Sequence, residues 1–125
     1  MLSRRMMFVL ALLGLVAMAV AACGPGGGAS ASAGSVTVNI EGTEFAFKPD
    51  TINAAPGQKV TVNFKNTGTV EHTLDIKDVN FKLDAQPGQT VSGTFTAPST
   101  AGTYKMTCDI AGHSEAGMVG QLVVK

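Results

Sequence analysis

Residues 56–64 read Pro-Gly-Gln-Lys-Val-Thr-Val-Asn-Phe, which is a turn followed by a strand. Proline presets the first corner of a turn, and Gly57 can adopt the positive φ that a type II turn needs at its second corner. From Val60 to Phe64 apolar residues then alternate with polar ones. Alternation with a period of two is typical of a half-buried β-strand. This stretch therefore predicts a strand with one face against a core.

The same alternation recurs from Ser35 to the end of the chain. It is found at residues 36–40, 45–47, 74–76, 91–95, 104–106 and 122–124. A second Pro-Gly-Gln turn opens the strand at Val91, and no stretch of this part has a sustained helical period. Short strands separated by Gly, Pro and Asn are typical of two packed sheets, so we predict an all-β, Greek-key sandwich of about seven to eight strands.

The N-terminal part of the chain has a different composition. Arg4 and Arg5 precede an apolar run over residues 6–20, and residues 20–23 read Val-Ala-Ala-Cys. A charged start, an apolar middle and small residues before a cleavage point are typical of an export signal. Val-Ala-Ala-Cys is similar to the lipobox of bacterial lipoproteins, which implies that Cys23 is lipidated and becomes the first mature residue.

Other interpretations of this region stay open. Residues 6–22 have a borderline length for a membrane-spanning helix. An even number of cysteines in an exported protein would also allow a disulfide between Cys23 and Cys108. The Ser-Arg-Arg triplet at residues 3–5 faintly resembles a twin-arginine export signal, so the export route is left undecided.

Residues 24–34 contain only Gly, Pro, Ala and Ser, a composition typical of a flexible linker. We therefore expect a lipoprotein signal peptide at 1–22, a lipidated cysteine with its linker at 23–34, and one domain at 35–125. The expected location is the outer, periplasmic or extracytoplasmic face of a bacterial cytoplasmic membrane.

The charge of the chain excludes one class of partner. Its 125 residues include nine basic and nine acidic side chains, and removal of Arg4 and Arg5 with the signal leaves seven basic ones. A slightly acidic domain has no basic surface for nucleic acid. Membrane attachment would then depend on the lipid of Cys23 and not on a polybasic patch.

Residues 108–118 place three metal-binding residue types in one short loop. Cys108, His113 and Met118 offer a thiolate, an imidazole and a thioether. One cysteine and two histidines with a weak axial methionine are the ligands of an electron-transfer copper site. The only other histidine of the chain is His72, so this hypothesis requires His72 to lie beside the loop.

The strand pattern agrees with that requirement, because side chains on a strand alternate between its faces. His72 is in phase with Leu74, and Cys108 is in phase with Met106, so both candidates are expected to point inward. An unpaired thiol in an oxidising compartment is protected when a metal holds it as thiolate.

Each candidate also has an ordinary structural interpretation. His72 could be a hydrogen-bonded core residue, Cys108 a small buried hydrophobe, His113 a surface residue and Met118 a core residue. Taken together, the four are interpreted as the ligands of one copper ion. Met106 is the alternative to Met118 for the axial position.

These motifs resemble those of type 1 blue copper proteins of the plastocyanin and azurin family, the cupredoxins. The resemblance lies in residues 45–49, 56–60 and 72–74 and in the Cys-x4-His-x4-Met loop, which is similar to that of auracyanin-like members. Many relatives have Asn after the first histidine, where this chain has Thr73. The binuclear copper site of cytochrome oxidase subunit II needs a second cysteine where this chain has Gly112, which excludes a binuclear centre.

The resemblance implies one Cu(I)/Cu(II) ion and a one-electron carrier, not an enzyme. It also implies that electrons leave through His113 and the small apolar residues around it. We expect a monomer that meets membrane-bound redox complexes or cytochromes transiently. A copper-delivery module and a cupredoxin-like domain with an incidental metal are the alternatives.

Overall fold

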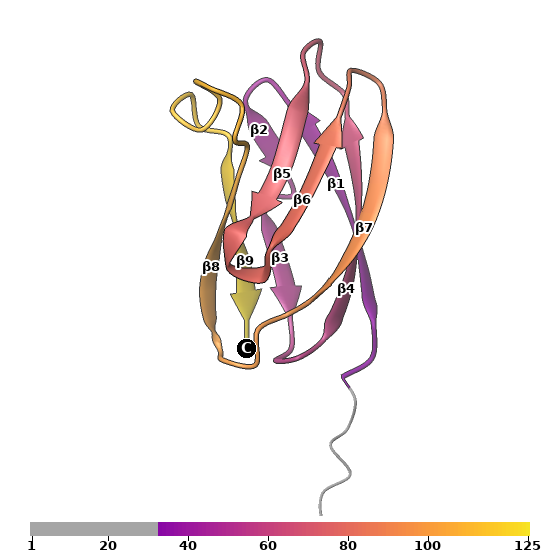
Figure 1. Ribbon diagram of the computed structural model, residues 1–125, viewed down its shortest axis with the longest axis vertical. Coiled ribbons are helices and arrows are strands. Elements are labelled where there is room, and N and C mark those ends of the chain that lie inside the picture. The colour runs from indigo at the N-terminus through magenta and orange to yellow at the C-terminus, as the bar shows by residue number, and fades with distance from the viewer. Residues whose placement is uncertain (1–32) are drawn as a thin grey trace, which may run out of the picture.

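The computed structural model describes residues 33–125 (Figure 1). The expected signal peptide, Cys23 and nearly all of the linker lie outside the described residues. Within them, the strands are β1 (Val36–Thr43), β2 (Ala46–Lys48), β3 (Thr51–Ala54), β4 (Lys59–Asn66), β5 (His72–Ile76), β6 (Phe81–Ala85), β7 (Thr90–Thr96), β8 (Gly102–Thr107) and β9 (Val119–Val124). A 3₁₀ helix, η1 (Lys77–Val79), follows β5. Over residues 33–125, no helix has the length and apolar character that crossing a bilayer requires.

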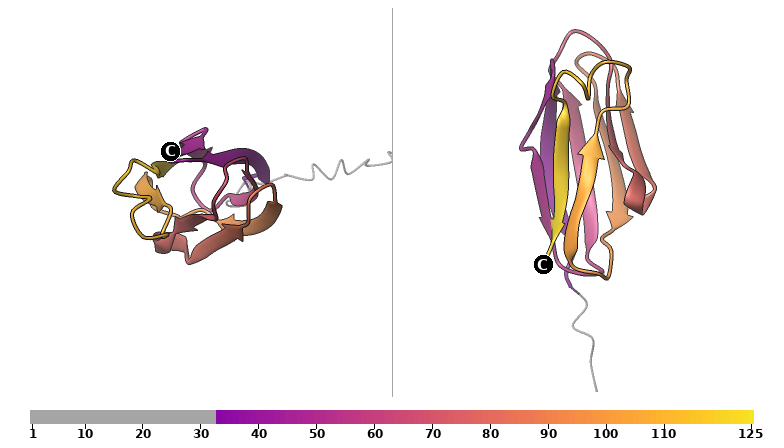
Figure 2. Two further views of the ribbon diagram at one scale, coloured as in Figure 1. Left: turned by 90° about the horizontal axis from the view of Figure 1, so that it is seen from above. Right: turned by 90° about the vertical axis from the view of Figure 1, so that its left-hand side faces the viewer.

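The strands form two sheets that enclose one core (Figure 2). One sheet has the order β2-β1-β4-β7 and the other the order β3-β9-β8-β5-β6. In β4 the residues Val60, Val62 and Phe64 are fully buried, as their alternation predicted. Each predicted strand segment overlaps a strand, but β2 begins at Ala46, so Phe45 of the predicted segment 45–47 lies in the turn before it and is exposed. The predicted all-β sandwich is confirmed.

Strand β5 departs from the alternation, because all five of its residues are buried. Its apolar Leu74 and Ile76 face the core as predicted. Thr73, on the opposite face, is only 1% exposed, because the side chain of Asp109 lies over it and hydrogen bonds to it. A polar residue of this strand is therefore buried by a loop that follows β8.

The two sheets bring distant segments to one end of the sandwich. β5 and β8 are antiparallel neighbours, with Asp75 opposite Thr107, so the start of β5 lies beside the end of β8. The loop after β8 lies at this end, and Figure 1 shows the C-terminus at the other. The first described residues also lie at that far end.

Candidate metal centre

His72, Cys108 and His113 converge at the end of the sandwich where β5 begins and β8 ends. The Nδ1 atoms of the two histidines are 3.3 Å apart, and Cys108 Sγ is 3.4 Å from His113 Nδ1. The three donor atoms all lie within 4.8 Å of one another. His72 and Cys108 are fully buried and His113 is 9% exposed. The sequence-based requirement that His72 should lie beside the loop is met.

The spacing of these atoms fits a single metal ion. Metal–nitrogen bonds of about 2.0–2.1 Å and metal–sulfur bonds of about 2.3 Å, the values for zinc, place neighbouring donors around one ion roughly 3.3–3.8 Å apart. The observed separations of 3.3 and 3.4 Å lie in that range. A thiolate and two imidazoles are the donors of a blue copper site. The residues present therefore fit the copper ion that the sequence predicts.

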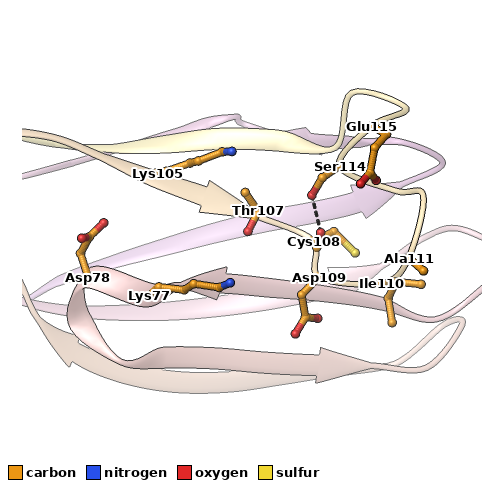
Figure 3. Close-up of a pocket in the computed structure, with 10 residues that line it drawn as sticks. All are labelled: Lys77, Asp78, Lys105, Thr107, Cys108, Asp109, Ile110, Ala111, Ser114 and Glu115. Carbon is orange, nitrogen blue, oxygen red and sulfur yellow. Dashed lines mark hydrogen bonds between the residues drawn. The ribbon is translucent and has the colours of Figure 1, made fainter.

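Hydrogen bonds within the loop between β8 and β9 fix its conformation. The hydroxyl of Ser114 donates to the carbonyl of Cys108 at 2.5 Å, a bond drawn in Figure 3. The backbone N–H of Met118 donates to His113 O, and that of Cys108 donates to Met118 O. Gly112 has a φ of 84°, a left-handed conformation that glycine adopts without steric cost. These hydrogen bonds close the loop around the three candidate ligands that it carries, Cys108, His113 and Met118.

The two methionines of the domain occupy different places. Both are fully buried. The methyl group of Met118 lies 3.3 Å from the position that a Cβ on Gly42 would take, close to the ring of Phe64. Met106 lies on β8, and its methyl group is beside Gly120 of β9. Met118 is joined to Cys108 and His113 by backbone hydrogen bonds, and its axial role stays a prediction.

Thr73 lies against the sulfur of Cys108. Its backbone N–H donates to Cys108 Sγ at 3.4 Å, and its hydroxyl oxygen is 3.5 Å from the same sulfur. The hydroxyl is 2.6 Å from Asp109 Oδ1 and accepts from the N–H of Asp109 at 2.9 Å. Because a hydroxyl carries one proton, the short bond to the carboxylate takes it, and the backbone N–H is the donor left for the sulfur.

A lysine fixes the Asp109 carboxylate from outside. Lys82 Nζ is 2.8 Å from Asp109 Oδ2. Hydrogen bonds from Lys82 and then from Thr73 hold the pKa of Asp109 below its usual value, and the same bond to Asp109 raises the pKa of Lys82. Both groups therefore stay charged near neutral pH, and Asp109 remains an acceptor for the Thr73 hydroxyl.

Replacement of Thr73 by valine should destabilise the copper-free domain by about 1–3 kcal/mol, because the Asp109 N–H loses a buried acceptor. Valine keeps the shape of threonine, so the comparison isolates the hydroxyl. Urea unfolding measures the change. Thr61→Val is the control, since the hydrogen bond between Thr61 and Thr94 is exposed to solvent. Equal losses in both variants would contradict the prediction.

Glu44, in the turn between β1 and β2, contacts the opposite side of the cluster. Its Oε1 lies 3.5 Å from His72 Nε2. Burial lowers the pKa of His72 below its ordinary value, the nearby Glu44 carboxylate partly opposes this, and His113 lowers it further. His72 is therefore neutral, the form that can bind a metal, over a wider pH range than an exposed histidine.

Phe45 covers part of His113. The two rings meet edge to face with centroids 4.9 Å apart, and Phe45 is 40% exposed. The neighbours expected around the electron exit are at the surface: Ala111, Gly112 and Ala116 are exposed and Ile110 is half-buried. His113 itself contributes little surface, so Phe45 is the largest apolar group there.

Sequence reasoning did not identify Glu44, Asp109, Lys82 or Phe45 as neighbours of the cluster. Asp109 could have been found, because continuing the pairing of Asp75 with Thr107 by two residues places it opposite Thr73. Charged side chains of both signs line a pocket beside Cys108 and Asp109 (Figure 3): Lys77 and Asp78 lie on one side, Lys105 on another, and Glu115 in the loop.

A β-sandwich that holds a buried His-Cys-His cluster at one end has the architecture and the donor set of a type 1 copper protein. Comparison with known proteins agrees. Residues 8–124 match the family described as cupredoxin-like domain, and the chain belongs to that family.

The chain is also similar to named members with this fold. It is 33% identical over 96 residues to rusticyanin of Acidithiobacillus ferrooxidans, an alignment that spans 62% of each chain. A crystal structure of dithionite-reduced auracyanin from Roseiflexus castenholzii matches with a TM-score of 0.65 and 27% identity, over 74% of this chain and 98% of that one. Auracyanin A of Chloroflexus aurantiacus, described as a "blue" copper protein, matches with a TM-score of 0.62 and 29% identity, over 73% and 99%.

Proposed function

We propose that this protein is a one-electron carrier that holds one copper ion through His72, Cys108, His113 and Met118. The observation that carries the proposal is the buried convergence of two imidazole nitrogens and one cysteine sulfur within 4.8 Å. When bound at such a site, copper exchanges one electron between its Cu(I) and Cu(II) states. The blue copper description of auracyanin A supports the same assignment.

The protein's contribution is to keep the donors in place while the electron moves. His72 is held at the start of a strand in the middle of a sheet, and Cys108 directly follows another. His113 and Met118 are fixed by the hydrogen bonds of their loop. Their burial excludes water, and no donor needs to move when the charge of the ion changes. Such a site suits a carrier and not an enzyme, which would keep a metal position open for substrate.

The surface beside His113 is proposed as the place where redox partners dock. Phe45, Ile110, Ala111 and Ala116 form a small, mostly apolar patch there. Small patches suit the weak, transient contacts of electron-transfer partners. We propose membrane-bound redox complexes or cytochromes as these partners, and a monomer as the working form.

Attachment through lipid on Cys23 is part of the proposal. The described chain begins at the end of the sandwich away from the ligand loop (Figure 1). A tether at that end, on the outer face of the cytoplasmic membrane, leaves the patch around His113 free to meet partners. Mass spectrometry of the protein from a bacterial membrane fraction tests this point: an unmodified N-terminus would contradict it.

Spectroscopy and voltammetry test the carrier. Residues 35–125, loaded with Cu(II), should show a strong thiolate-to-copper band in the visible spectrum, a type 1 EPR signal and a reversible one-electron wave. Copper binding without a reversible wave would favour copper delivery over electron transfer. Absence of the visible band in the loaded protein would falsify the site.

Substitution of the two methionines tests the axial assignment. Met118→Gln should shift the reduction potential downward, because an amide oxygen is a harder donor than a thioether and favours Cu(II). Met106→Leu is the matched control: it keeps a similar volume in the core, and its potential should stay near that of the parent. Cyclic voltammetry measures both. A shift in the Met106 variant alone would move the axial role to Met106.

A further inference from the structure

We propose that Glu44 is a positioning residue for His72: its carboxylate holds the imidazole proton on Nε2, so that Nδ1 presents its lone pair to the metal position. The inference rests on the proposed copper site but concerns a residue outside the ligand set. It assigns a function to Glu44, which is 28 residues before His72 in the sequence. In the structure this glutamate lies in the turn between β1 and β2, beside the His72 ring.

The first observation is the isolation of His72 Nε2. This atom is buried, and it has no hydrogen-bond partner of ordinary geometry among residues 33–125. Glu44 Oε1 lies 3.5 Å from it. Hydrogen bonds in active sites are often long before the bound state forms and tighten afterwards. A metal at Nδ1 makes the Nε2 proton more acidic, which strengthens its bond to a carboxylate.

The second observation is that the carboxylate is fixed where it lies. Glu44 Oε1 accepts hydrogen bonds from the backbone N–H groups of Thr69 and Val70, and it lies 3.3 Å from the Thr69 hydroxyl. Gly68 leaves the space for it, because a Cβ at residue 68 would collide with the Glu44 carboxyl group. The segment that leads into His72 therefore wraps around Glu44 and sets its carboxylate against the ring.

The charge state of Glu44 agrees with this role. The hydrogen bond from the Thr69 N–H does most to lower the pKa of Glu44, against a smaller effect of desolvation. An ionised carboxylate only accepts hydrogen bonds, so it favours the histidine tautomer that carries its proton on Nε2. The other tautomer would point a proton at His113 Nδ1, 3.3 Å away, and block the metal position. Carboxylates that orient metal-binding histidines in this way are a general feature of metal sites.

The test compares Glu44→Gln with Glu71→Gln in the full-length protein. Glutamine keeps the size of Glu44 and an oxygen for the Thr69 and Val70 N–H groups, but its amide can donate to Nε2 as well as accept. Glu71 is exposed and adjacent to His72 in the chain, so its variant controls for the loss of one negative charge. The ¹⁵N shifts of the His72 ring in copper-free protein report the tautomer, and competition titrations report Cu(II) and Cu(I) affinity.

In the parent protein we expect the Nε2–H tautomer of His72, and in Glu44→Gln a measurable population of the Nδ1–H form. Cu(II) affinity should fall by about 10–100-fold in Glu44→Gln, and by far less in Glu71→Gln. If Cu(I) affinity is unchanged, each tenfold loss raises the one-electron potential by about 59 mV.

Two results would overturn the inference. One is an Nδ1–H tautomer of His72 in the parent, a measurement that does not depend on whether any variant folds. The other is a Glu44→Gln variant whose tautomer and affinity match those of Glu71→Gln. The tautomer is read without copper, so failure of the parent to bind copper would refute the proposed function and leave the role of Glu44 standing.

Discussion

Cys108→Ser is expected to abolish the visible absorption of the copper-loaded protein completely. The band arises from charge transfer between a thiolate and Cu(II), and Cys108 Sγ is the sulfur that faces both histidine nitrogens in the described structure. A serine hydroxyl is smaller, does not ionise near neutral pH and is a poor donor to a soft ion. The variant should fold, because serine fits where cysteine does, and it should bind copper weakly through the two imidazoles. Visible and EPR spectra at equal copper loading measure the change.

Cys23→Ser is the matched control for this experiment. It removes the other sulfur of the pair and should leave the band unchanged, since Cys108 is a free and fully buried thiol in the described part of the chain. A band that is absent in the parent and present in Cys23→Ser would point to the disulfide alternative, because a disulfide would keep the Cys108 sulfur from the ion. Retention of the band in Cys108→Ser would mean that another sulfur binds the ion, and the cluster would lose its assignment.

The cluster of His72, Cys108 and His113 could be predicted from the sequence because short-range patterns place these residues. The alternation of β5 and β8 fixes which way His72 and Cys108 point, and a single loop carries His113 and Met118. His72 begins β5 and Cys108 follows the end of β8. Because these strands are antiparallel neighbours, the two residues lie at the same end of the sheet. The departure at Thr73 was visible in the sequence too, and the structure shows what it does: its backbone N–H contacts the sulfur while its hydroxyl bonds to Asp109.

The contacts around the cluster could not be predicted in the same way. Glu44 and His72 are 28 residues apart, and Lys82 and Asp109 are 27 apart. A lone charged residue in a turn has no periodic pattern that identifies its partner. The parallel pairs of β1 with β4 and β3 with β9 decide which turns meet at the ligand end. They join strands that are not consecutive, which alternation alone does not specify.

Gly120→Ala is expected to destabilise the domain by about 2 kcal/mol or more, at the upper part of the range for an overpacked core. Gly120 lies in β9 opposite Met106 of β8. A Cβ at this position would collide with the backbone oxygen of Asp50, which leads into β3, and would lie 2.5 Å from the Met106 methyl group. The methionine can move, but the Asp50 oxygen cannot move freely, because it accepts a hydrogen bond from the Gln121 N–H at 2.8 Å. The pairing of β3 with β9 must therefore shift.

Gly102→Ala is the matched control, because it makes the same substitution at a strand glycine that has room for a Cβ. Gly102 lies at the start of the neighbouring strand β8 and pairs with Val124. The nearest atom to an added Cβ is in the ring of Tyr104, at 3.8 Å, an ordinary contact. At a site with room, alanine restricts the unfolded chain and is neutral or stabilising by up to about 1 kcal/mol. Urea unfolding should show a lower midpoint with an unchanged slope for Gly120→Ala alone. Similar midpoints in the two variants would contradict the prediction. They would mean that β3 can move away from β9 at little cost in the free energy of unfolding.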